Sequence, residues 1–357
     1  MVSPVRTNMT FQTRRIIRSA PAFEQTEGIN TVVQRSIGHM AKRNFTPFLV
    51  FDHFRFQAAQ ATTIGGFPDH PHRGQETVTY LLDTSVGGGI AHEDFMGSKG
   101  ILGPGDLQFM IAGRGVVHAE MPVFDNHNND DHIENESIIE GIQMWLDLPE
   151  NKRDSDPTYT NVYGKDVPVA DLGLGRSVNV ISGSAFGHIG PATGASVTPL
   201  LFLDFSFANS SGWGSKTEVI EPIQLAIPKD YNVVVYVVSG NVKINDSTSA
   251  SGPLTCVLFD QSGDGIEFSS VADVFSGRTG TSDNGKGNGI PSAARFIVVA
   301  GQALVNQAVV QRGPFVATTL ERIRETERDY RLLENGFERA RGWSSDIGKR
   351  ASRLYRG

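Results

Sequence analysis

The sequence predicts an all-β protein built from two β-barrel modules, with one helix near the end of the chain. Its 39 glycines and 17 prolines are spread widely, and the apolar segments between them are short and rich in valine, isoleucine and phenylalanine. Such segments, bounded by turn-forming residues, are typical of β-strands. Helical periodicity is convincing only within residues 318–341, where apolar side chains recur among many charged ones.

The expected strands fall into two series, which favours two modules of similar size. The first series comprises residues 48–51, 77–82, 89–95, 106–111 and 142–146. The second comprises residues 177–182, 200–207, 224–227, 233–239, 241–244, 255–259, 265–268 and 294–300. Turn-rich elements recur in both series, so the sequence is consistent with a duplicated barrel.

These series divide the chain into four expected parts. A flexible leader covers residues 1–14, an N-terminal barrel 15–150, a C-terminal barrel 176–312 and a helical segment 313–357. The linker between the barrels is expected within residues 149–175. Residues 125–136 and 276–292 lack apolar periodicity and are interpreted as exposed loops.

The composition excludes several classes of function. The chain has a formal net charge of -7 and a pI of about 5.7. Direct, sequence-independent binding to nucleic acid needs a concentrated basic surface, so none is expected. No apolar run has the length that a membrane-spanning helix requires, and we expect no membrane contact.

The single cysteine, Cys256, excludes an intramolecular disulfide and favours a reducing compartment, the nucleus or the cytoplasm. We interpret it as a buried small hydrophobe. The N-terminus carries Arg6, Arg14, Arg15 and Arg18 and has no acidic residue before Glu24, a composition also found in organellar transit peptides. A flexible leader is the favoured interpretation, with organellar import as the alternative.

Two short clusters, His70-Pro71-His72 and His118-Ala119-Glu120, carry the strongest chemical signal. Side chains two residues apart on a strand point the same way. If the intervening strands bring the clusters together, three imidazoles and one carboxylate converge on one point. Such a ligand set suits Fe(II), Mn(II), Ni(II), Cu(II) or Zn(II) and leaves room for exogenous ligands.

Spacing alone leaves two glutamates open as the fourth ligand. Glu76 follows His72 by four residues with the same strand parity, and Glu120 has the matching parity with His118. The location of the site is less ambiguous. Eight of the nine histidines lie in the first module, and the second contains only His188, so we expect one metal site in the N-terminal barrel.

Other polar residues near the clusters have weaker claims. His53, His92 and Glu93 are candidate hydrogen-bond partners for the ligand histidines. Arg73 and Arg114 adjoin the two clusters. They would orient the ligands or attract an anionic substrate, or they are ordinary surface or structural arginines. His127 and His132 lie in an acidic loop, which we interpret as solvated rather than as a second cation site.

Several longer stretches resemble the pirin family of bicupins. The similarity is carried by GGFPDHPHRG (residues 65–74), AHEDF (91–95), PGDLQ (104–108), AGRG (112–115) and HAEMP (118–122). It continues in GPFV (313–316) and NGFERA (335–340) and covers about residues 15–348.

The resemblance implies two facing cupin-type barrels with a C-terminal helix and a single Fe(II) in the N-terminal barrel. The family's ligands match His70, His72, His118 and Glu120, which selects Glu120 over Glu76. The sequence departs from the family at His53, where relatives often carry an acidic residue. Residues 126–136 and 276–292 look like insertions, and the first follows the second ligand cluster directly.

The resemblance also implies two activities. The leading hypothesis is a quercetin 2,3-dioxygenase-like enzyme that opens the ring of a flavonol or another small phenolic substrate with O2, with Glu120 as the base that accepts the substrate's hydroxyl proton. The alternative is a non-enzymatic, redox-responsive nuclear transcription coregulator that binds protein partners. A purely structural metal site is a third, weaker hypothesis.

Overall fold

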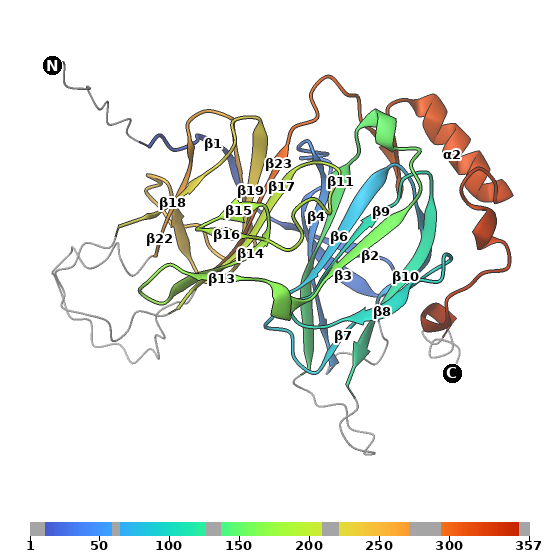
Figure 1. Cartoon of the computed structure of the whole chain (residues 1–357), viewed down its shortest axis with the longest axis horizontal. Coiled ribbons are helices and arrows are strands. Elements are labelled where there is room, and N and C mark those ends of the chain that lie inside the picture. Colours follow the sequence, from blue (N-terminus) through green and yellow to red (C-terminus); the bar gives the residue numbers. More distant parts are fainter. Residues whose placement is uncertain (1–10, 59–64, 126–136, 209–220, 271–293, 350–357) are drawn as a thin grey trace.

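Strands separated by glycine-containing turns form most of the regular structure in the computed structural model, which describes residues 11–58, 65–125, 137–208, 221–270 and 294–349. Two strand-rich modules lie side by side, and helix α2 (Leu320–Leu332) lies at the outer edge of the first (Figure 1). The all-β class and the C-terminal helix predicted from the sequence are confirmed.

The first module consists of two opposed antiparallel sheets. The larger has the strand order β12 (Thr158–Val162), β9 (Leu107–Ile111), β6 (Gln75–Leu81), β11 (Ile138–Asp147), β4 (Phe48–Gln57), β3 (Thr31–Ile37) and β2 (Phe23–Glu27). The smaller has the order β5 (Phe67–His72), β10 (Val116–Phe124), β7 (Gly88–Asp94) and β8 (Lys99–Leu102).

The second module repeats this plan. Its larger sheet has the order β1 (Ile16–Pro21), β21 (Thr255–Phe259), β19 (Tyr231–Ser239), β23 (Ala294–Gln302), β17 (Leu200–Phe207), β14 (Arg176–Ser182) and β13 (Val169–Asp171). A smaller sheet has the order β18 (Ile223–Ala226), β22 (Gly265–Ser270) and β20 (Val242–Ile244). The short pair β15 (Ser184–Ala185) and β16 (His188–Ile189) belongs to the second module, whereas the pair β24 (Val310–Arg312) and β25 (Phe315–Ala317) packs against the first.

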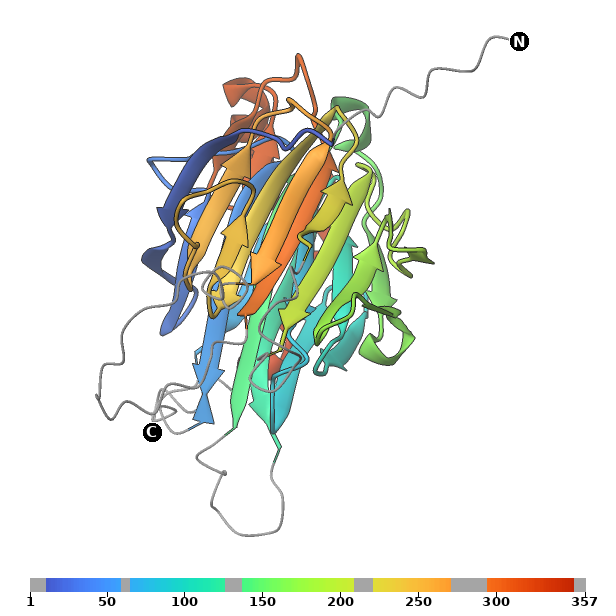
Figure 2. The same cartoon turned by 90° about the vertical axis from the view of Figure 1, so that its left-hand side faces the viewer.

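The modules pack through the outer faces of their two large sheets (Figure 2). One continuous apolar cluster contains side chains of both sheets, among them Phe51 and Val78 of the first and Phe202 of the second. Polar contacts also join the two sheets across this interface. The hydroxyl of Tyr80 donates to Asp204 Oδ2 at 2.7 Å, and Arg295 forms an ion pair with the same carboxylate.

The chain crosses between the modules more often than the expected division allows. Residues 16–21, assigned to the N-terminal barrel, form the edge strand of the second module, and the expected linker contains a strand of each module, β12 and β13. The described end of the expected leader is also fixed. Arg14 is 1% exposed, and its guanidinium donates to the carbonyl oxygens of Pro228 and Tyr231 at 2.7 and 2.6 Å.

The interior of the second module is filled with apolar side chains. The rings of Phe205 and Phe296 stack with centroids 4.9 Å apart, and Phe268 packs against both. Metal ligation needs polar donors that converge on one point, and this core offers none among its described members.

The C-terminal segment returns to the first module after β23. Phe315, Ile323 and Phe337 of this segment pack against Phe95 and Met110 of the first module. Asp69 of β5 and Arg73 of the following turn also contact this segment, through Ser345 and Asp329.

In the part of the chain that the structure describes, no helix is long and apolar enough to cross a membrane. Cys256 is buried, as predicted, and burial raises the pKa of its thiol to about 12. Residues 126–136 with His127 and His132, and residues 276–292, lie outside the described residues.

Candidate metal centre

The two histidine clusters lie on adjacent antiparallel strands of the small sheet. In the register of β5 and β10, His118 is opposite His70, and Val116 is opposite His72. A bulge lies between His118 and Glu120, so that Glu120 is opposite Phe67. Because these pairs project into the space between the two sheets, the chain brings together residues that are 46 positions apart in sequence, from His72 to His118.

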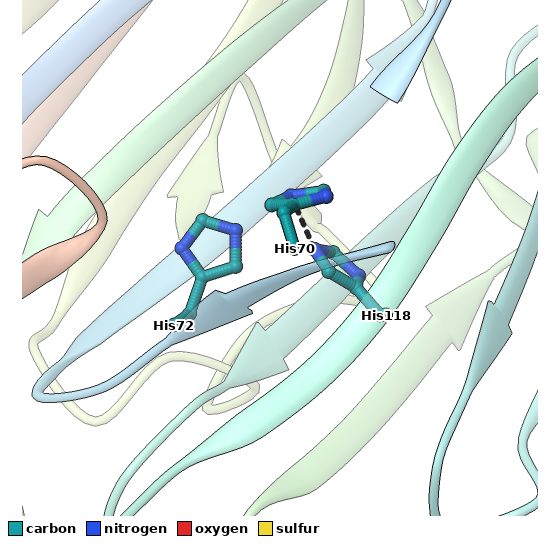
Figure 3. Close-up of side chains that lie close together, drawn as sticks. All are labelled: His70, His72 and His118. Atoms are coloured by element: carbon teal, nitrogen blue, oxygen red, sulfur yellow. Dashed lines mark hydrogen bonds between the residues drawn. The ribbon is translucent and has the colours of Figure 1, made fainter. Parts of the chain in front are cut away.

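The three imidazoles converge, each from its own strand position (Figure 3). One ring nitrogen from each of His70, His72 and His118 lies within 4.8 Å of the other two. The Nε2 atoms of His70 and His118 are 3.0 Å apart, and Glu120 Oε2 lies 4.0 Å from His118 Nε2. Among the described residues no other group of three histidine, cysteine or acidic side chains comes this close.

Burial keeps these histidines neutral. Loss of solvation lowers the pKa of His70, and it lowers the pKa values of His72 and His118 well below the usual histidine value. The Nδ1–H of His70 donates to the carbonyl oxygen of Pro68 at 2.8 Å, which leaves the lone pair of Nε2 directed into the cluster. A neutral imidazole with a free nitrogen is the form that binds a metal ion.

Glu120 adds a carboxyl group with a raised pKa. Burial raises its pKa to about 7, and a hydrogen bond from Thr79 opposes that rise. Thr79 Oγ1 lies 2.8 Å from Glu120 Oε1 and 2.7 Å from Gln143 Oε1. A hydroxyl has a single proton, so it donates to one of these oxygens, and the other neighbour must donate to it. A Gln143 amide turned so that its Nε2 donates to Thr79 satisfies this arrangement and leaves Glu120 as a carboxylate that accepts from Thr79.

The donor set fits a divalent transition metal ion. His72 Nε2 is buried and has no hydrogen-bond partner within the described structure, although burying an unpaired polar nitrogen is costly. Three neutral imidazole nitrogens and one carboxylate are a common set for Fe(II), Mn(II), Ni(II) and related ions. The same donor set suits each of these metal ions.

The cluster opens into a cavity of about 980 Å³ within the first module. Its apolar wall includes Phe67, Val50 and Trp145, whose indole meets the His72 ring edge-on at 5.0 Å. Two arginines also line the cavity. Arg35 forms an ion pair with the buried carboxylate of Asp52, whereas Arg43 forms no ion pair within the described part of the chain. A volume of this size is typical of cavities that bind small molecules.

Comparison with known proteins agrees with this architecture. The Pirin family model matches residues 30–146, and the model of the Pirin C-terminal cupin domain matches residues 216–336. The chain belongs to the pirin family. Human Pirin is 37% identical to it over 337 residues, which cover 94% of this chain and 98% of the human protein. A pirin-like protein of Solanum lycopersicum is 33% identical over 332 residues, 93% of this chain and 96% of that protein.

Solved structures show the same bicupin fold. Quercetin 2,3-dioxygenase from Acinetobacter baumannii superimposes with a TM-score of 0.70 at 24% identity, covering 90% of this chain and 98% of that one. The bacterial pirin YhhW from Escherichia coli, in complex with nickel(II), gives a TM-score of 0.51 at 17% identity, with 79% and 96% coverage. The predicted family and the predicted pair of cupin modules are therefore confirmed.

Glu76, the other glutamate that the spacing left open, lies away from the pirin histidine cluster. Its carboxylate accepts hydrogen bonds from Ser196 Oγ at 2.7 Å and the Val197 N–H at 2.8 Å, both from the second module. The parity argument fails because the turn at Gly74, with a φ of +86°, separates β5 from β6. Strand parity does not carry across a turn.

The expected partners of the ligand histidines lie elsewhere. His53 contacts the Tyr236 hydroxyl at 3.0 Å and Glu140 at 2.9 Å in the module interface. His92 lies beside Gln108, and the Glu93 carboxylate accepts hydrogen bonds from two N–H groups of the C-terminal segment. None of the three has a recorded hydrogen bond to His70, His72 or His118.

The two arginines next to the clusters serve the structure rather than the cavity. Arg73 forms an ion pair with Asp329 of α2 and lies over the ring of Phe337. Arg114 is exposed and pairs with Asp156. The sequence interpretation missed Thr79, Gln75 and Gln143, which contact the site from β6 and β11. Thr79 and Gln75 are buried polar residues and Gln143 is half-buried, but no sequence pattern distinguishes them.

Proposed function

We propose that His70, His72, His118 and Glu120 hold one divalent transition metal ion, Fe(II), and that the protein is a dioxygenase for a flavonol such as quercetin or another small phenolic substrate. The observation that carries the proposal is the convergence of three neutral imidazoles, two of them buried and that of His70 half-buried, with a carboxylate on a cavity of about 980 Å³. A structural metal site does not require a cavity of this size beside it.

Two comparisons support the proposal. The superimposable enzyme from Acinetobacter baumannii is described as a quercetin 2,3-dioxygenase, and the Escherichia coli pirin was crystallised with nickel(II). Nickel in a relative supports a transition-metal site. The choice of iron comes from the family resemblance.

The bound metal would supply Lewis acidity toward a substrate hydroxyl and access to O2 chemistry. This chain's residues have three tasks. Phe67 and Trp145 offer apolar surfaces for a planar ring system. Glu120, the carboxylate 4.0 Å from His118, accepts the hydroxyl proton of the substrate. Thr79 holds the carboxylate of Glu120 in place through its hydrogen bond.

The decisive experiment loads the full-length protein with Fe(II) under anaerobic conditions and then measures O2 uptake and loss of flavonol absorbance with quercetin. We expect O2 and quercetin to be consumed in equal amounts. Full iron occupancy without O2 uptake would exclude quercetin as the substrate.

Two buried glutamates provide a matched pair for that assay. Glu120→Gln removes the proposed proton acceptor, and we expect turnover to fall by about 100-fold or more. Glu76→Gln changes a carboxyl with a similar pKa, also about 7, outside the cavity, and should leave turnover unchanged. Equal losses in both variants would point to a general loss of stability.

A second candidate function is a metal-dependent regulator that binds protein partners in the nucleus. It is favoured by the contact between the ligand strand and the C-terminal segment, where Ser345 N–H donates to Asp69, the residue before His70. A change at the metal would thereby reach an exposed surface. Pull-downs with the Fe(II) and Fe(III) forms test this function, and identical partner profiles would count against it.

A further inference from the structure

We infer that Gln75 is a positioning residue, which selects the ring nitrogen that His72 presents to the metal and couples this choice to the C-terminal segment. The inference rests on the proposed metal site. Gln75 is fully buried at the start of β6, three residues after His72 and across the turn at Gly74. It has no place in the predicted ligand set.

The side chain of Gln75 bridges two parts of the molecule. Its amide Nε2 lies 2.9 Å from His72 Nδ1 and 2.8 Å from the carbonyl oxygen of Pro314. An amide –NH2 has two protons, so it donates to both. Pro314 also lines the cavity, so the same amide links a proposed ligand to the cavity wall.

This arrangement leaves two buried atoms without partners. Gln75 Oε1 accepts no hydrogen bond, and His72 Nε2 has no partner either, within the described structure. When Nδ1 of a neutral imidazole accepts, the proton is on Nε2. A protonated Nε2 cannot bind a metal ion, so this tautomer of His72 is the metal-free one.

One rotation of the Gln75 amide would give Oε1 and His72 Nε2 a partner, at the cost of both hydrogen bonds that Gln75 Nε2 now donates. A half-turn about the Cγ–Cδ bond places Oε1 against His72 Nδ1, which then carries the proton and donates to Oε1. The lone pair of Nε2 becomes free for the metal, as in other sites where an acceptor behind a histidine fixes its tautomer. The carbonyl oxygen of Pro314 loses its donor in that state.

Metal binding at His72 and the hydrogen bond from Gln75 to Pro314 therefore compete. The surrounding backbone fixes Gln75 in both states, because Val316 N–H donates to Arg73 O at 3.0 Å and Arg153 Nη1 donates to Gly74 O at 2.8 Å. A Cβ at Gly74 would lie 2.0 Å from the Val316 carbonyl oxygen, so this turn and residues 314–316 can approach only with glycine there.

Three variants test the inference on the full-length chain. Gln75→Leu removes donor and acceptor, and we expect the Kd for Fe(II), measured anaerobically against a chromophoric chelator, to rise about 10- to 100-fold. Gln75→Glu offers only an acceptor to His72 Nδ1 and nothing to Pro314, so its Kd should fall below that of the wild type. Both variants should lower the Tm of the metal-free protein, because both leave the Pro314 carbonyl unpaired.

Gln307→Leu is the matched control. Gln307 also ties the C-terminal segment to the first module, through hydrogen bonds to Asp147 and Leu148, but it does not contact a histidine. We expect this variant to lower the Tm of the metal-free protein without changing the Kd. An equal rise in Kd for Gln307→Leu and Gln75→Leu would overturn the positioning role.

Cu(II) as a probe adds a readout that a structural role would not change. The electron paramagnetic resonance spectrum of the wild type should show hyperfine coupling to three imidazole nitrogens, and that of Gln75→Leu to two. If Gln75→Leu does not fold, Gln75→Glu alone decides, and a Kd weaker than that of the wild type contradicts the inference. If the wild type binds no metal, the proposed function and this inference fail together. If the wild type binds metal and the Gln75 variants have the same Kd, only the inference fails.

Discussion

Glu76 and Glu120 share a raised pKa of about 7, for the same reason, but face different parts of the molecule. Both carboxyls are buried, and burial disfavours their charged form. Glu120 lies 4.0 Å from His118 in the first module's interior, whereas Glu76 is hydrogen-bonded to Ser196 and Val197 of the second module. One glutamate therefore belongs to the candidate metal centre and the other to the contact between modules.

Glu76→Gln should flatten the pH dependence of stability in the metal-free protein. The folded-state pKa of Glu76 lies above its unfolded value of 4.5, so the folded state binds more protons between pH 4.5 and 7 and stability falls as pH rises through this window. A glutamine at this position does not titrate, so the variant does not lose this stability as the pH rises. The variant should therefore gain stability relative to the wild type between pH 5 and pH 8, by up to about 3 kcal/mol.

Urea unfolding at both pH values measures this difference. Glu120 titrates in the same window and remains in both proteins, so the comparison isolates Glu76. An equal stability difference at pH 5 and pH 8 would contradict the prediction.

His118→Ala should abolish stoichiometric metal binding, because it removes a nitrogen from the centre of the cluster and leaves two imidazoles. We expect the affinity for Fe(II) to fall by at least about 100-fold. His92→Ala is the control, since His92 is also buried and lies on the neighbouring strand β7, outside the cluster. Metal analysis after dialysis separates them, and full occupancy in His118→Ala would overturn the site.

Thr79→Val should weaken metal binding by about tenfold while leaving the fold intact, because valine preserves the shape but removes the hydroxyl that holds Glu120. Thr77→Val is the matched control. Thr77 lies on the same strand and is also buried, but its side chain has no recorded hydrogen bond. Chelator competition measures both variants, and similar affinities would show that Thr79 does not position the carboxylate.

Arg14→Ala should destabilise the protein by about 3 kcal/mol, because it leaves the carbonyl oxygens of residues 227, 228 and 231, of which that of 227 is buried, without this donor. Arg15→Ala serves as the comparison. The side chain of Arg15 is 77% exposed and forms a single ion pair with Asp260, so its loss should cost about 0.5 kcal/mol or less. Chemical denaturation checks both, and equal effects would refute the anchoring of residues 11–14.

Much of the fold could be predicted from local sequence. The segments around Val78, Phe202 and Val298 form strands where they were expected, because runs of branched and aromatic residues between glycine and proline turns have few other ways to bury their side chains. The helix was also recognisable, with Thr319 accepting a hydrogen bond from the Arg322 N–H at its N-terminus.

The strands that carry the proposed ligands did not appear in the list of expected strands. β5 contains two prolines, and β10 contains a bulge beside Glu120, so neither has the simple alternation of apolar and polar residues that predicts a strand. Their importance was visible only in the chemistry of the residues, not in the pattern.

The sequence by itself determined the all-β class, the module that carries eight of the nine histidines, and, through the family resemblance, the proposed ligand set. The tertiary structure decided what those residues contact. It placed Glu76 at the module interface, assigned β1 to the second module, and set Gln75 and Thr79 behind His72 and Glu120. The physical reason is that strand periodicity specifies which face a residue occupies, whereas the turn geometry and the pairing of distant strands specify its neighbours.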